Sequence, residues 1–277
     1  MAAYFFLSRL FLMSADLRRR RLLAAAPAWT LLGLGACASP PSEPVAHPHR
    51  PTSVPLFSSV AEGAPPPEGW RPYILRPDRV KTAYSMVRRD GRIALHAVAD
   101  SASSGLSCAV DIDALRTPWL RWEWRVDTVY PNATVADDLR EDTPARLVVA
   151  FGGDMSRLSL RDRVFFEQVE LFTGNELPFA TLTYVWDGEL AVDSTPQYPR
   201  SSRIRYDVIE SGAAHAGQWR RYERNVLDDY RRVFGEAPSG PITSVGVLTD
   251  SDDLKNHAEA WYGDIGLYAT SVAAASA

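Results

Sequence analysis

The chain has 277 residues, with 30 lysines and arginines against 34 aspartates and glutamates and a formal net charge of −4. Residues 1–37 carry five of the basic side chains and one of the acidic ones, so the remainder has 25 basic and 33 acidic side chains and a net charge of −8. This acidic balance argues against nucleic acid or an anionic membrane surface as the partner.

The first 37 residues have the features of an export signal. Four arginines, Arg18–Arg21, precede an apolar run from Leu22 to Leu34, which is shorter than the roughly 20 residues of a membrane span. The run ends in Leu34-Gly35-Ala36-Cys37, which resembles a bacterial lipobox, so we expect cleavage before Cys37 and lipidation of that cysteine. The arginines are compatible with both general secretion and twin-arginine export, and both Met1 and Met13 are compatible with a start codon.

Residues 38–67 are rich in Pro, Ser and Ala and lack a sustained hydrophobic period, which predicts a tether. Ala38 and Ser39 resemble residues that permit sorting to the outer membrane. We therefore expect a lipid-anchored domain that faces the periplasm, with the lipid bilayer as its partner through Cys37. The last residues, 271–277, are expected to form a disordered tail.

Residues 68–270 are numerous enough for a single domain with one core. The clearest strand is 120–126, where Leu120, Trp122, Trp124 and Val126 alternate with charged residues. Similar alternation predicts further strands, separated by turns that contain Gly and Asp, at 93–97, 106–110, 147–151, 164–171, 182–186, 242–248 and 261–268. We expect an all-β fold, an antiparallel β-sandwich of jelly-roll, galactose-binding or concanavalin-like type.

One segment has helical spacing. Val226, Tyr230, Val233 and Phe234 repeat every three or four residues and Gly235 follows, so we expect one short helix near 226–235. Cys108, the other cysteine, lies in an apolar strand and is expected in the core.

Several short blocks carry a family resemblance. In chain order they include Trp122-Glu123-Trp124-Arg125-Val126, Leu182-Thr183-Tyr184-Val185-Trp186 and Thr249-Asp250-Ser251-Asp252. Together they resemble an uncharacterised family of exported bacterial proteins, the domain of unknown function 3047, over nearly the whole domain. The resemblance implies export and a single domain, and no activity. The ending Trp261-Tyr262-Gly263-Asp264-Ile265 is also similar to the last strand of carbohydrate-binding and glycan-processing sandwiches, which is a likeness of fold.

Aromatic and polar residues near turns are candidate ligand contacts. Trp122 and Trp124 share a face with Leu120 and are expected in the core. Indole faces outside the core can stack on sugars, and for each such residue the alternative is a structural role. The candidate ligand-binding residues are Trp119, Trp219, Trp261, Tyr262, Arg146, Arg224 and Asn225.

Acidic residues near the C-terminus form a candidate Ca²⁺ site. Asp250, Asp252 and Asp253 share one loop, and Asp264 follows one strand later. Carboxylate oxygens suit Ca²⁺, which accepts six to eight of them. The alternative is a solvated turn in which the aspartates cap backbone amides. No other cofactor is expected.

The sequence contains no Gly-x-Ser-x-Gly elbow, phosphate-binding glycine loop, close cysteine pair or histidine pair at ligand spacing. A glycoside hydrolase needs two carboxylates roughly 5 to 9.5 Å apart. Candidates are Glu123, Glu167, Glu170, Asp138 and Asp264, with Glu167 and Glu170 expected on opposite faces of one strand.

Three functions are therefore left open. The favoured one is a ligand-binding module of the cell envelope that recognises a glycan or another envelope component. The alternatives are an enzyme acting on polysaccharides or glycosides and a structural domain that binds a protein partner. Ligand identity, catalysis and oligomeric state are not determined by the sequence.

Overall fold

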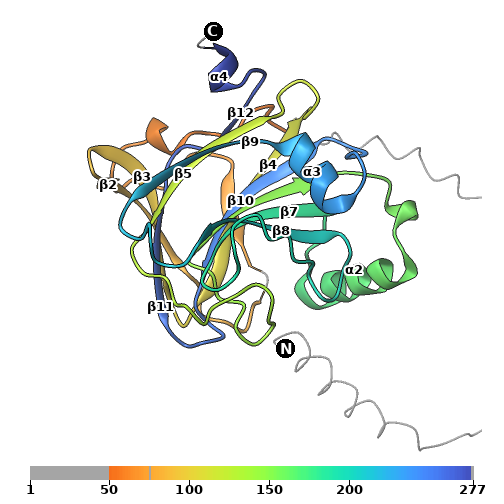
Figure 1. Cartoon of the computed structure of the whole chain (residues 1–277), viewed down its shortest axis with the longest axis horizontal. Coiled ribbons are helices and arrows are strands. Elements are labelled where there is room, and N and C mark those ends of the chain that lie inside the picture. Colours follow the sequence, from red (N-terminus) through yellow and green to blue (C-terminus); the bar gives the residue numbers. More distant parts are fainter. Residues whose placement is uncertain (1–49, 75, 276–277) are drawn as a thin grey trace, which may run out of the picture. The chain divides into compact units, whose positions relative to one another are not determined.

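Two β-sheets pack face to face in the computed structural model, which describes residues 50–74 and 76–275 (Figure 1). Sheet 1 has the strand order β1 (Trp70–Tyr73), β4 (Ser103–Ile112), β10 (Ile242–Asp250), β6 (Ala145–Phe151), β7 (Ala180–Asp187) and β8 (Ile204–Ser211). Neighbouring strands of sheet 1 are antiparallel except for the parallel pair β7 and β8. The expected signal peptide and Cys37 lie outside the described residues.

Sheet 2 is antiparallel throughout. Strand β9 (Trp219–Asn225) pairs with one side of β5 (Trp119–Val126), and β11 (His257–Tyr262) and β12 (Gly266–Tyr268) pair with the other side. Strands β3 (Arg92–Asp100) and β2 (Ala83–Arg89) complete the sheet beyond β11. The predicted β-sandwich is confirmed.

The core lies between the two sheets because each strand presents its apolar side chains inward. In β5 every second residue is buried, from Leu120 to Val126, as the alternation predicts. Trp124 of sheet 2 packs against Trp186 of sheet 1, with ring centroids 6.4 Å apart. Cys108 is fully buried in the same core, as expected.

Helix α3 (Val226–Phe234) confirms the predicted short helix. Asn225 caps its first turn, where Asp228 and Asp229 lie, and Arg231 and Arg232 lie in its last turn. Acidic residues at the start of a helix and basic residues at its end both complement the helix dipole.

The structure differs from the prediction at residues 164–171, which belong to helix α2 (Leu160–Thr173) and not to a strand. Ser159 caps the helix and Gly174 ends it in the left-handed conformation. The apolar residues of α2 lie on two sides of the helix, since Phe165 and Phe166 are buried whereas Leu160 and Leu171 are exposed. The sequence therefore shows no single apolar stripe at helical spacing. Within the eight residues 164–171 the apolar and polar residues instead resemble the alternation of a strand.

The borders of the domain and of the last strands also differ from the prediction. Val54 and Phe57, in the expected tether, are buried in the core, so the folded unit begins before residue 68. The expected strand 261–268 is divided between β11 and β12. Strands β1, β2, β8 and β9 were not predicted, and neither were the short helices η1 (Phe57–Ser59), η2 (Met155–Arg157) and α4 (Val272–Ala275), the last of which lies in the expected tail. None of the described helices is long and apolar enough to cross a membrane.

Candidate functional site: a groove on the outer face of sheet 1

Loops cover part of the outer face of sheet 1, and another part is open. Val185, Tyr206 and Val208 form a small apolar cluster with Val135, from the segment between β5 and β6, and Leu190 packs against this cluster. On the rest of that face a groove of about 680 Å³ crosses the sheet beside helix α2. Residues of β1, β4, β10, β6 and β7 line it, so it spans four strand spacings, about 19 Å.

Small side chains make up much of the floor of the groove. Ala109 from β4, Ala150 from β6 and Gly246 from β10 all line it, which leaves volume above the sheet. Ser107 and Thr181 add hydroxyl groups at the β4 and β7 sides. The floor is therefore partly apolar and partly able to donate and accept hydrogen bonds.

A β-bulge adds two neighbouring hydroxyls to the floor. The register of β10 against both of its neighbours shifts between Ile242 and Ser244. Ile242 and Val245 point into the core, whereas Thr243 and Ser244 both line the groove. In a regular strand two consecutive side chains would face opposite sides, so the bulge doubles the hydroxyls at this point.

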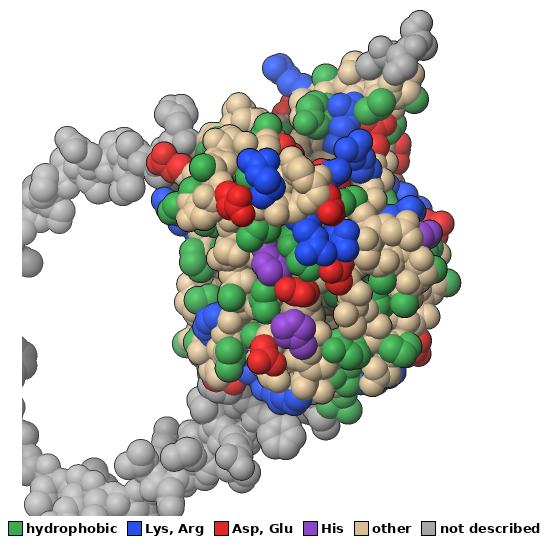
Figure 2. All heavy atoms as spheres, turned by 90° about the vertical axis from the view of Figure 1, so that its left-hand side faces the viewer, with side chains coloured by type: hydrophobic (Ala, Val, Ile, Leu, Met, Phe, Trp, Pro, Cys, Tyr) green, Lys and Arg blue, Asp and Glu red, His purple; other side chains and the backbone are tan. Residues whose placement is uncertain are grey.

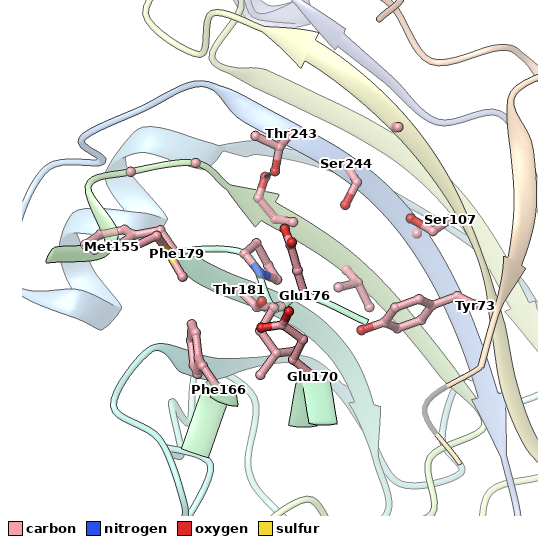
Figure 3. Close-up of a pocket in the computed structure, with 18 of the residues that line it drawn as sticks. Tyr73, Ser107, Met155, Phe166, Glu170, Glu176, Phe179, Thr181, Thr243 and Ser244 are labelled. Carbon is pink, nitrogen blue, oxygen red and sulfur yellow. Dashed lines mark hydrogen bonds between the residues drawn. The ribbon is translucent and has the colours of Figure 1, made fainter. Parts of the chain in front are cut away.

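Helix α2 forms one wall of the groove, which Phe166, Glu167 and Glu170 line from this helix. Figure 3 shows Phe166 and Glu170 on this wall. The helix is held by Asp162, which is 1% exposed. Its carboxylate accepts hydrogen bonds from the hydroxyls of Ser159, Ser201 and Ser202 at 2.6 to 2.7 Å. Burial by itself would raise the pKa of Asp162, but these hydrogen bonds outweigh it and hold the pKa below its usual value.

Two aromatic side chains close the ends of the groove. In Figure 3 the ring of Tyr73, from the edge strand β1, lies across from Phe179 and points its hydroxyl toward the middle of the groove. Burial raises the pKa of Tyr73 to about 12, so the phenol stays neutral and can donate a hydrogen bond. Gly153 is needed beside Phe179, because a Cβ atom at residue 153 would lie 2.4 Å from the Phe179 ring.

The charged residues of the groove have no ion-pair partner among the residues that the structure describes. They are the carboxylates of Glu167, Glu170 and Glu176 and the guanidinium groups of Arg163 and Arg50. Many charged groups elsewhere are paired, as in the 2.6 Å contact between Arg92 and Glu123. The groove thus offers free charges, hydroxyls and aromatic edges to a ligand.

None of the ligand-binding residues expected from the sequence lines this groove. Trp119, Trp219 and Trp261 lie on the outer face of sheet 2, which Figure 2 shows as a surface of interspersed acidic, basic and histidine side chains. Trp261 is 4% exposed, because His96 stacks on it at 4.6 Å and Arg89 lies over it at 4.5 Å. Trp119 and Trp219 are partly exposed, and their ligand role stays a prediction.

Tyr262, Arg224 and Asn225 have structural contacts. Tyr262 is fully buried and donates to the backbone oxygen of Leu248 at 2.8 Å, so the expectation that it contacts a ligand is corrected. Arg224 donates two hydrogen bonds to Asp229, at 2.6 and 2.8 Å. Asn225 accepts from the first backbone amides of α3.

Two buried carboxylates, Asp207 and Asp229, lie near Arg224. Burial raises the pKa of Asp207, which is fully buried and lies 3.4 Å from Arg224. Burial acts on Asp229 in the same direction, but its hydrogen bonds with Arg224 outweigh burial and lower its pKa. These carboxylates have opposite pKa shifts, as an acid and base pair would, but they lie inside the fold and do not line the groove.

The predicted Ca²⁺ residues are brought together only in part. Asp250 and Asp252 converge with Asp142, and one ligand atom of each lies within 4.8 Å of the others. All three side chains are buried. Asp264 lies at the opposite end of β11, where its carboxylate accepts from the amide and hydroxyl of Ser58, so its assignment to this cluster is corrected.

Arginines already neutralise part of this acidic cluster. Arg146 lies 3.0 Å from Asp250, and Arg79 lies 3.1 Å from Asp252. Both oxygens of Asp142 accept backbone amides. Burial, followed by the neighbouring Asp252, raises the pKa of the half-buried Asp253 to about 6. The oxygens suit a hard cation, but guanidinium and amide groups occupy several of the same lone pairs.

The carboxylates expected for catalysis are dispersed. Glu123 pairs with Arg92 and Arg221 on sheet 2, and Asp138 lies in the segment between β5 and β6. Glu167 and Glu170 lie one helical turn apart on one side of α2, which corrects their expected placement on opposite faces of a strand. No sequence pattern predicts Glu176 and Tyr73 as site residues, because Glu176 lies in the loop between α2 and β7, Tyr73 ends the short edge strand β1, and the fold sets the neighbours of both.

A comparison with protein-family models places the chain. Residues 68–266 match the family described as Protein of unknown function (DUF3047). The chain belongs to this family. No curated protein matches the chain. Membership in DUF3047 accounts for the blocks seen in the sequence and carries no assigned activity.

Solved structures similar to this DUF3047 protein include two carbohydrate-binding domains and an arabinofuranosidase. One is the family 11 carbohydrate-binding module from Clostridium thermocellum, with 10% identity, a TM-score of 0.38 and coverage of 80% of this chain and 97% of that one. The carbohydrate recognition domain of Emp47p has 14% identity, a TM-score of 0.35 and coverage of 79% and 96%. An α-L-arabinofuranosidase, MgGH51, has 8% identity, a TM-score of 0.38 and coverage of 77%, and this chain spans only 25% of it. Similarity of this degree does not transfer a function.

Proposed function

We propose that this DUF3047 domain is a binding module of the cell envelope and that it holds a short stretch of glycan in the groove on sheet 1. The observation that carries the proposal is the groove itself, a cavity of about 680 Å³ that crosses five strands. Ligand pockets in proteins generally have volumes of about 300 to 1,000 Å³.

The lining of the groove suits a glycan because sugar rings have apolar faces and polar edges. Tyr73, Phe166 and Phe179 provide aromatic surface for the apolar faces. Ser107, Thr181 and the bulge residues Thr243 and Ser244 provide hydroxyls that both donate and accept. The length of about 19 Å favours several sugar units over one.

Filling the groove tests this proposal. Ala109 is an exposed floor residue, so Ala109→Trp should block the groove without disturbing the core. Ala83→Trp makes the same change at an exposed position of β2 outside the groove and serves as the matched control. We expect oligosaccharide binding, measured by titration calorimetry against a panel of bacterial envelope glycans, to be lost in the first variant and kept in the second. Equal binding by both variants would place the glycan elsewhere.

An enzymatic function is the second candidate, and one observation favours it. Glu167, Glu170 and Glu176 line a single groove, and glycoside hydrolysis uses two carboxylates around the scissile bond. Incubation of the bound oligosaccharide with the protein, followed by chromatography of the products, separates the two functions. Cleavage that is absent from Glu170→Gln and Glu176→Gln would establish catalysis.

Export and lipid anchoring through Cys37, to the outer membrane facing the periplasm, are part of the same proposal and rest on the sequence of residues 1–37. The test is fractionation of a bacterium that expresses the full chain, with palmitate labelling. We expect the wild-type chain in the membrane fraction and labelled, and Cys37→Ala unlabelled. A labelled Cys37→Ala protein would contradict lipidation at this residue.

A further inference from the structure

The carboxylates of the groove gather around the C-terminal half of helix α2. Glu167 and Glu170 are one turn apart on the side of the helix that lines the groove, and Glu176 follows three residues after the end of the helix. Figure 3 shows Glu170 and Glu176 beside the same cavity. Like charges one turn apart on a helix repel each other, and no cation among the described residues pairs with these three.

The helix dipole adds to this negative potential. The C-terminal end of α2 carries partial negative charge from its last carbonyl groups, and its last turn contains no basic residue. Helix α3 of the same protein shows the usual compensation, with Arg231 and Arg232 in its last turn. The end of α2 therefore lacks a positive charge at the point where it borders the groove.

The arginines of the groove do not supply this charge. Arg163 lies on α2 one turn before Glu167 and two turns, about 10 Å, before Glu170, and it makes no ion pair with either glutamate. Arg50 lines the groove and likewise has no ion-pair partner among the described residues. The wall formed by α2 is thus polarised, with its negative end at Glu167, Glu170 and Glu176.

We propose that the ligand of the groove is a cationic glycan, one whose sugars carry free, protonated amino groups in place of acetamido groups. This inference rests on the proposed function and specifies the ligand of the same site. An ammonium group donates three hydrogen bonds. Its positive charge complements the three carboxylates and the negative C-terminal end of α2. The small floor and the aromatic ends would hold the sugar rings, and the carboxylates would select the amine.

The test compares two probes that differ only in the amine. Oligomers of glucosamine and of N-acetylglucosamine of equal length are titrated into the protein below the pKa of the amine. We expect the glucosamine oligomer to bind at least about tenfold more tightly, as two charge-assisted hydrogen bonds would provide. Its affinity should fall with added salt and with pH above the pKa of the amine, and the affinity of the acetylated oligomer should change little.

Variants assign the effect to the carboxylates. Glu170→Gln with Glu176→Gln should lower the affinity for the glucosamine oligomer about tenfold. Both residues are exposed, so the fold should be kept, which circular dichroism verifies. Glu68→Gln changes an exposed glutamate outside the groove and should have no effect. Equal binding of the two oligomers would overturn the cationic ligand and leave glycan binding in place, whereas binding of neither would overturn both.

Discussion

The hydroxyl of Ser201 donates a hydrogen bond of 2.7 Å to the carboxylate of Asp162, and this contact joins helix α2 to the segment between β7 and β8. Ser202 donates to the same carboxylate through its amide and its hydroxyl. The wall of the groove is thereby fixed by a buried charge with several donors and does not depend on apolar packing alone. A wall held in this way keeps the groove open in the absence of ligand.

Removal of this anchor should destabilise the protein and loosen the groove. We expect Asp162→Ala to lower the free energy of unfolding by about 3 kcal/mol, because several hydrogen bonds to a buried charge are lost together. Hydrogen exchange should accelerate in residues 160–173. Asp154→Ala removes an exposed aspartate that caps η2 through Ser156 and should cost about 1 kcal/mol. Equal costs for the two variants would contradict the role assigned to Asp162.

The acidic cluster should make stability depend on pH. The pKa of Asp253 is raised from 3.8 to about 6 in the folded protein. A raised carboxyl pKa contributes stability that is fully present below the unfolded value and is lost as pH rises through the folded value. As pH rises from about 4 to about 6, the contribution of Asp253 to the free energy of unfolding should therefore decrease.

Asp253→Asn should flatten the pH dependence in this window, as measured by urea denaturation at several pH values. Burial also raises the pKa of Asp250, so part of the decrease in the free energy of unfolding with pH should remain in this variant. Asp111→Asn, at an exposed position of β4, is the control and should leave the curve unchanged. An unaltered slope in Asp253→Asn would show that the group does not titrate in this range.

Calcium should have little effect on the folded protein. Arg146, Arg79 and two backbone amides already contact the oxygens of Asp142, Asp250 and Asp252. We expect the same Tm with Ca²⁺ and with EDTA, measured by differential scanning calorimetry. A Tm raised by Ca²⁺ in the wild-type protein and not in Asp252→Asn would instead establish a cation site at this cluster.

The tryptophans on sheet 2 distinguish the groove from the other face of the sandwich. If the groove on sheet 1 holds the glycan, the double variant Trp119→Ala and Trp219→Ala should bind it with unchanged affinity, because both residues lie on the opposite sheet. Titration calorimetry with the oligosaccharide bound by the wild-type protein measures this. A loss of binding in this variant and not in Ala109→Trp would transfer the site to sheet 2.

The local sequence pattern was sufficient to predict the secondary structure of segments that bury one side and expose the other. The alternation in β5 and the caps of α3 predicted both elements, because one face of each is buried and the other is solvated. The same reasoning failed for α2, whose outer side carries the exposed Leu160 and Leu171. The cover that Arg89 and His96 place over Trp261 is likewise invisible in the sequence, because these residues are distant along the chain.

The sequence by itself determined the all-β class, the family, the burial of Cys108 and the helix at 226–234, since each depends on a short-range period or on blocks of adjacent residues. Only the tertiary structure decided where a ligand can be held. The groove is formed by residues from Arg50 to Val247 on five strands and one helix, and its volume exists because small side chains of separate strands become neighbours. Strand order and the packing of α2 create that neighbourhood, and they are set by long-range contacts that no local period encodes.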